Sequence, residues 1–233
     1  MGDHHQKSSC CEYEQSSGVL NEIICHFPYA LLALTIGLIA LSIMTVDIPA
    51  NRMLLHLRFF PLFHTCHFMH ILFAAAGCFL TFLRYSRNWL RGFIVGTIVP
   101  VIFCVLSDIV LPYVGGMILG VPMHLHICFV TEYVNVGIFL AVGILAGVVL
   151  HFHVEQKHSG SFLTRWLHFG HILLSALASL FYLVSHGFSD WAHYIGPVYV
   201  LLVIAVVIPC TLSDLVVPVV VAKSGGCDGC DKV

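Results

Sequence analysis

Two pairs of histidines with the same spacing stand inside apolar stretches of this sequence. His67 and His70 occur in HFMHIL, and His168 and His171 occur in HFGHIL, 101 residues later. Residues three apart on an α-helix lie on one face, so each pair can direct its imidazoles toward a common centre. Imidazole nitrogen is a ligand of zinc, iron and other first-row transition metals, and the pairs therefore predict metal-binding chemistry.

A second motif also occurs twice, as CVLSDIVLP (104–112) and CTLSDLVVP (210–218), and it supplies acidic groups. Its aspartates, Asp108 and Asp214, together with Glu132, lie within predicted apolar spans, where insertion of a charge costs at least about 2.5–3.5 kcal/mol. Carboxylates that are present in a membrane span despite this cost are candidates for a functional role. Secondary candidates for binding a metal or orienting its ligands are Cys104, Ser107, Cys210, Ser213, His64, Cys227 and Cys230. The other cysteines of the apolar part, Cys25, Cys66, Cys78 and Cys128, are predicted to be packing residues.

The chain that carries these groups is too apolar to be solvated by water alone. Of its 233 residues, 59% are hydrophobic and 9% are charged, whereas a soluble domain has about 25% charged residues. Uncharged runs of about twenty residues match a hydrocarbon layer of about 30 Å when they are helical. The sequence predicts an all-α membrane protein with six spans, near 27–46, 66–83, 92–113, 127–150, 166–184 and 196–222.

The repeated motifs indicate that a three-helix unit is duplicated. Asp214 follows Asp108 by 106 residues, and the segment His26–Ala40 resembles Glu132–Ala146 at the same offset. Because three spans end on the opposite side from where they began, the second unit would be inverted relative to the first, as in the inverted repeats of many transporters. The predicted organisation is a polar head (1–23), two repeats (24–116 and 117–222) and a Cys-x-x-Cys tail (223–233).

The distribution of basic residues predicts the orientation of the chain. The side shared by both termini holds Lys7, Arg84, Arg87, Arg91, Lys157, Arg165, Lys223 and Lys232, whereas the other side holds only Arg52 and Arg58. The positive-inside rule therefore predicts a multi-pass protein with both termini in the cytoplasm. The net charge of −2 gives no indication of nucleic-acid binding.

This topology predicts one ligand cluster near each face of the membrane. The outer cluster would contain His67, His70 and Asp108 with Glu132 from the second repeat, and the inner cluster would contain His168, His171 and Asp214 with His26 from the first repeat. The predicted function is a transporter or channel for a divalent transition-metal ion, with zinc or iron favoured, rather than an enzyme. Its expected partners are the lipid bilayer, the metal ion and, as an option, further copies of the chain. Simple His–Asp hydrogen bonding and a proton relay are alternatives for the same residues.

Two further functions are also compatible with the sequence. The segments HTCHFMH (64–70) and CVLSD (104–108) resemble the zinc-binding segments of the seven-span ceramidase and adiponectin-receptor hydrolases, a likeness that implies a membrane-embedded zinc hydrolase acting on a lipid. The span count and the order of the motifs depart from that family. The spacing of His171 and His186 is also compatible with a haem protein for transmembrane electron transfer.

Overall fold

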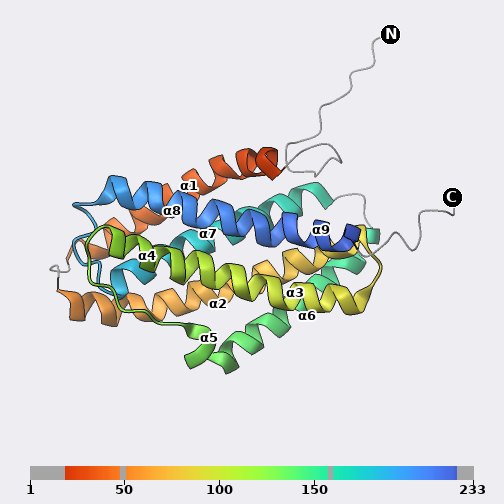
Figure 1. Cartoon of the computed structure of the whole chain (residues 1–233), viewed down its shortest axis with the longest axis horizontal. Coiled ribbons are helices and arrows are strands. Elements are labelled where there is room, and N and C mark those ends of the chain that lie inside the picture. Colours follow the sequence, from red (N-terminus) through yellow and green to blue (C-terminus); the bar gives the residue numbers. More distant parts are fainter. Residues whose placement is uncertain (1–18, 48–50, 157–159, 225–233) are drawn as a thin grey trace, which may run out of the picture.

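The computed structural model describes residues 19–47, 51–156 and 160–224 of the chain, with side chains left undescribed at 19–22, 25 and 154–167. All regular structure in these ranges is helical, and the long helices lie side by side along the longest axis of the molecule (Figure 1). Six helical segments are long and apolar enough to cross a membrane: His26–Thr45, Arg52–Tyr85, Trp89–Ile118, Tyr133–His153, His168–Ser185 and Ile195–Ser224.

The helices follow one another with short connections. In chain order they are α1 (Val19–Thr45), α2 (Arg52–Tyr85), α3 (Trp89–Val105), the π-helical turn η1 (Leu106–Val110), α4 (Leu111–Ile118), α5 (Cys128–Thr131), α6 (Tyr133–Gln156), α7 (Gly160–Ser185), α8 (Ile195–Thr211), the π-helical turn η2 (Leu212–Val216) and α9 (Val217–Ser224). The described starts of α1 and α7 lie at the same end of the bundle as the ends of α2, α6 and α9 (Figure 1). We call this the terminal end, and the opposite one the loop end.

The second span begins much earlier than the sequence pattern predicts. The side chain of Asn51 caps α2 by accepting hydrogen bonds from the backbone N–H groups of Met53 and Leu54, and the helix continues through Pro61. Polar residues in its first turns caused the shorter prediction. As a consequence, His67 lies close to the middle of a 34-residue helix rather than at its start.

Both copies of the Ser-Asp motif form a π-helical turn. The turn η1 holds Leu-Ser-Asp-Ile-Val and η2 holds Leu-Ser-Asp-Leu-Val, and each interrupts an otherwise α-helical span. A π turn inserts one extra residue into the helix, which changes the direction of its side chains, and such turns are frequent at functional sites. Ser107, Asp108, Ser213 and Asp214 are all buried.

Glycines bring the first helix of each predicted repeat close to the middle helix of the other. A Cβ atom at Gly37 in α1 would lie 2.7 Å from the side chain of Leu180 in α7. A Cβ atom at Gly143 in α6 would collide with the carbonyl oxygen of Leu72 in α2. These two contacts place α2 and α7, the helices that carry the paired histidines, in the interior of the bundle.

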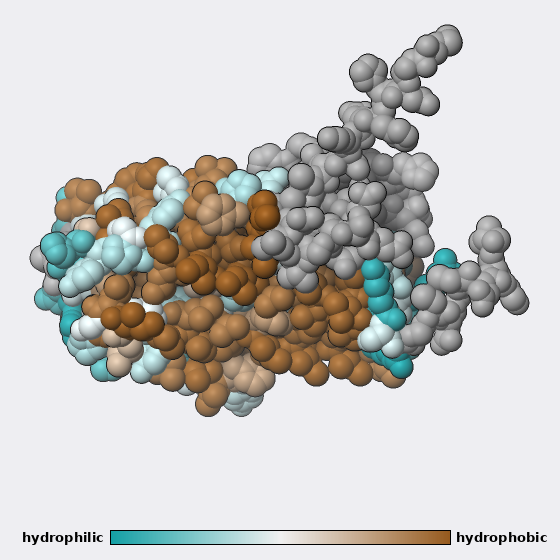
Figure 2. Space-filling view, turned by 45° about the horizontal axis from the view of Figure 1, so that its top comes forward, coloured by the Kyte–Doolittle hydropathy of each residue, from teal (hydrophilic) through white to brown (hydrophobic). Residues whose placement is uncertain are grey.

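The middle of the molecule has an apolar surface. Figure 2 shows a broad hydrophobic face between hydrophilic patches at the two ends. Large hydrophobic side chains are exposed on several helices, including Ile39, Ile98, Ile138, Leu145 and Ile204. Such an extensive exposed apolar surface is unfavourable in water and indicates a lipid environment, so the structure is that of a multi-pass membrane protein.

Candidate metal centre

Asp108 is a fully buried carboxylate whose two oxygens both accept hydrogen bonds. Its Oδ2 accepts hydrogen bonds from the Nδ1 atoms of His67 and His70, at 2.8 and 2.7 Å. Its Oδ1 accepts from the hydroxyls of Ser107 and Ser175, at 2.7 and 2.9 Å. An ionised carboxylate can only accept, so each imidazole donates a hydrogen from Nδ1, and in its neutral form each imidazole has a lone pair on Nε2.

The two histidine pairs meet at the centre of the bundle. The Nε2 atom of His70 lies 3.3 Å from the Nε2 atom of His171, which comes from α7. The thiols of Cys104 and Cys210 each lie 3.8 Å from the same His70 nitrogen. We call His70, His171 and Cys210 the central site, because their ligand atoms all lie within 4.8 Å of one another and all three residues are buried.

The separations at the central site resemble those around a tetrahedral ion. Zinc–nitrogen and zinc–sulfur bonds of about 2.0–2.1 and 2.3 Å give nitrogen–nitrogen and nitrogen–sulfur separations of about 3.3 and 3.5 Å. The observed values of 3.3 Å for His70–His171 and 3.8 Å for His70–Cys210 are close to these. The carboxylate of Asp108, which orients His70 through Nδ1, is the kind of outer partner that metal-binding histidines use.

Asp214 has fewer partners than its counterpart Asp108. Its Oδ2 lies 3.4 Å from His171 Nε2 and 3.7 Å from His168 Nδ1. Among the described residues, four buried atoms of this region have no hydrogen-bond partner: Asp214 Oδ1, Ser213 Oγ, His171 Nδ1 and His168 Nε2. The ring of His26 contacts the ring of His168 edge-on, with centroids 4.2 Å apart. This half of the core therefore offers polar atoms that a bound ion or water could satisfy.

The structure connects the two clusters that the sequence predicted as separate. His67, His70 and Asp108 gather as expected, and so do His168, His171, Asp214 and His26. The contact between His70 and His171 joins them, because the paired histidines lie deep within α2 and α7. Glu132 lies apart from both groups and accepts a hydrogen bond from Asn135 at 2.7 Å. Cys227 and Cys230 lie outside the described residues.

A second group of metal-binding residue types lies in the half of the bundle nearer the loop end. His64 of α2, His126 of the 119–127 segment and Cys128 of α5 place their ligand atoms within 4.8 Å of one another. Burial and the nearby His64 lower the pKa of His126. Burial also lowers the pKa of His186, whose ring stacks on that of His126, to about 4. These two imidazoles are therefore uncharged near neutral pH.

Sequence reasoning missed the serines of α7. Ser175 donates to Asp108, and Ser179 donates to the carbonyl oxygen of Ser107, at 2.9 and 3.1 Å. Both follow His171 on the same helical face, at intervals of four residues, and this spacing was the available signal. His126, which was not among the candidates, and Cys128, predicted to be a packing residue, are the other omissions, since their ligand atoms lie beside that of His64.

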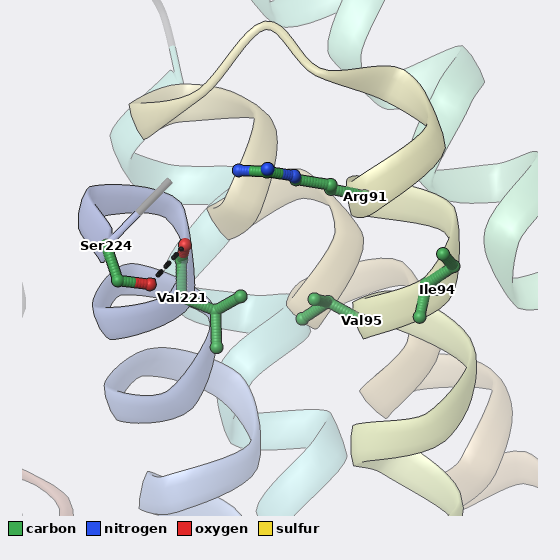
Figure 3. A pocket seen from close by; sticks show the side chains of 5 residues that line it. All are labelled: Arg91, Ile94, Val95, Val221 and Ser224. Atoms are coloured by element: carbon green, nitrogen blue, oxygen red, sulfur yellow. Dashed lines mark hydrogen bonds between the residues drawn. The ribbon is translucent and has the colours of Figure 1, made fainter. Parts of the chain in front are cut away.

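A separate pocket of about 440 Å³ opens at the terminal end between α3 and α9. Figure 3 shows its lining residues, Arg91, Ile94, Val95, Val221 and Ser224, and the hydrogen bond that the Ser224 hydroxyl donates to the carbonyl oxygen of Val221. The lining residues are mostly aliphatic and include none of the predicted metal ligands. The pocket is therefore distinct from the central site.

The fold and the core together define a class: an all-helical protein with six candidate membrane-spanning helices and buried His, Asp and Cys groups that could bind a metal. No protein-family model, curated protein or solved structure matches the chain.

Proposed function

We propose that this protein is a membrane transporter for a divalent transition-metal ion, with zinc as the favoured substrate. The observation that carries the proposal is the series of buried ligand groups along the bundle core: His67, Asp108, His70, His171, Asp214 and His168, followed by His26. Charged groups in a membrane interior are expensive and usually mark an ion pathway. Here they include the residue types that bind zinc.

The burial of these groups favours a carrier over an open channel. His67 and Asp108 are fully buried, and His70, His171 and Cys210 are almost fully buried. An ion could reach the central site only if the helices moved. Alternating access between two inverted repeats would provide such movement, and three features support the repeat: the two π turns, the two glycine contacts of α1 and α6, and the central contact between equivalent histidines.

The geometry favours metal binding over the alternative functions. In the hydrolase hypothesis, His64, His67 and His70 would hold one zinc, but the ligand atom of His64 lies with those of His126 and Cys128, whereas the ligand atom of His70 lies with those of His171 and Cys210. In the haem hypothesis, His186 would be an axial ligand, but its ring stacks against Tyr182 and His126. A proton relay through the same hydrogen-bonded groups is the alternative that the test must separate.

The test is metal uptake into liposomes that contain the purified full chain. We expect zinc uptake by the parent protein, and its loss in Asp214→Asn and His171→Gln. His153→Gln is the matched control, since His153 is exposed and its Nδ1 contacts only the carbonyl oxygen of Val149 on its own helix. Uptake equal to that of empty liposomes, or proton flux with no metal flux, would contradict the proposal.

A further inference from the structure

The half of the bundle nearer the loop end holds a group of donor atoms that the proposed pathway does not use. The Nε2 atoms of His64 and His126 lie 3.2 Å apart, which is close to the separation of about 3.3 Å for two imidazoles on one tetrahedral zinc. The thiol sulfur of the buried Cys128 lies within 4.8 Å of a ring nitrogen of each of the two histidines. Two imidazoles and a thiol form a donor set typical of zinc, cobalt and copper sites.

His64 is oriented for metal binding by its own helix. Its Nδ1 atom lies 2.9 Å from the carbonyl oxygen of Phe60, and because a carbonyl can only accept, the hydrogen is on Nδ1. The lone pair of Nε2 then points toward His126. A backbone carbonyl that fixes the tautomer in this way is a common outer partner of a metal-binding histidine.

The segment that carries His126 is also held in place. Tyr182 of α7 accepts a hydrogen bond from the backbone N–H of His126 and donates one to the carbonyl oxygen of His124, both at 3.2 Å. The backbone N–H of His124 donates to the carbonyl oxygen of His186 at 3.0 Å. The ligands of α2, the 119–127 segment and α5 therefore converge on a prearranged site, which lowers the cost of ordering them around an ion.

We propose that His64, His126 and Cys128 form a second transition-metal site, accessible from the loop end, with zinc as the favoured ion. Within the part of the chain that the structure describes, three protein ligands converge there, and His64 and His126 are partly exposed. Thr131, whose Oγ1 lies 3.4 Å from His126 Nε2, is exposed at the side of the site. A zinc ion with three protein ligands keeps a position for water or another ligand, which suits a site that exchanges its ion with the surrounding solution.

The site also adjoins the buried pathway. His64 precedes His67 by one turn of α2, so an ion at this site would lie next to the histidine that contacts Asp108. A site at this position could deliver a metal ion to the proposed pathway. The binding claim does not depend on transport, since the donor set and its orientation are independent of the central site.

Cobalt binding to the detergent-purified full chain tests the proposal, because thiolate-bound Co²⁺ has a sulfur-to-metal charge-transfer absorption. We expect Cys128→Ser and His126→Gln each to bind one cobalt ion fewer per chain than the parent, and Cys128→Ser to lose part of the charge-transfer absorption. Cys66→Ser, which removes a half-buried cysteine of α2 outside both sites, should leave binding unchanged.

The same measurements distinguish metal binding at the second site from metal binding at the central site. Cys210→Ser should alter the central site and leave the absorption that depends on Cys128 in place, whether or not the protein transports metal. Size-exclusion profiles that match the parent would establish that the variants are folded. Unchanged cobalt stoichiometry and absorption in both folded variants, Cys128→Ser and His126→Gln, would overturn the proposal.

Discussion

At the scale of single residues, the two aspartates of the repeated motif have different roles despite their equivalent positions. Asp108 accepts four hydrogen bonds from imidazoles and hydroxyls, whereas Asp214 Oδ1 has no partner among the described residues. Part of the difference comes from α7, where Ser175 donates to Asp108, while Ala74 stands at the equivalent position of α2. Asp108 therefore stabilises the fold, and Asp214 is the more available ligand.

This difference predicts unequal effects on stability. Asp108→Ala should destabilise the folded protein by about 3–5 kcal/mol, because it leaves two buried imidazole N–H groups without an acceptor. Asp214→Ala should cost less, since fewer hydrogen bonds are lost. Thermal unfolding in detergent without added metal measures both. Equal destabilisation, or a larger loss in Asp214→Ala, would show that the assignment of roles is wrong.

The types of residue that form the site were predicted from the sequence better than the contacts between them. The His-x-x-His and Ser-Asp spacings named most of the central groups, because these residue types are rare in apolar spans. The contact between His70 and His171 was not predictable, since it depends on how deeply α2 and α7 overlap. The cluster of His64, His126 and Cys128 was missed because a short segment outside the long helices completes it.

At the scale of the elements, close helix contacts set the position of the ligands. Gly143 allows the backbone of α6 to approach that of α2 at Leu72 and Ala75. Gly137, six residues earlier on the same helix, has open space where a Cβ would be. The number and approximate position of the spans followed from hydropathy, but these contacts, the early start of α2 and the π turns required the three-dimensional structure.

The two glycines of α6 provide a matched pair of substitutions. Gly143→Ala should destabilise the protein by about 1–3 kcal/mol, because the new methyl group forces α6 away from α2. Gly137→Ala should be neutral or stabilising by up to about 1 kcal/mol, since alanine is the better helix former. Unfolding temperatures of the two variants in the same detergent give the comparison, and a similar effect of both would refute the packing argument.

At the scale of the whole molecule, the number of spans determines where the termini lie. Six crossings return the chain to its starting side, and the starts of α1 and α7 share an end with α9 in the structure (Figure 1). Arg84, Arg87, Arg91 and Lys223 lie at this terminal end, whereas Arg52 and Arg58 lie in the first turns of α2 at the loop end. Basic residues prefer the cytoplasmic side.

We therefore expect reporters fused after residue 233 and before residue 1 to be cytoplasmic. A reporter inserted at Gly120, in the connection between α4 and α5, should lie on the opposite side. Protease protection in sealed vesicles measures all three. Termini on different sides of the membrane would contradict the six-span topology, and termini that are both outside would contradict only the orientation.

The central claim is that a transition-metal ion occupies the position where the two histidine pairs meet. Crystals of the zinc-loaded full chain, with X-ray data collected on both sides of the zinc absorption edge, would locate the ion directly. We predict an anomalous peak between His70 Nε2 and His171 Nε2, within bonding distance of Cys210 Sγ, and its absence in His171→Gln. A map with zinc elsewhere, and with the two imidazoles joined only by a hydrogen bond, would contradict the account.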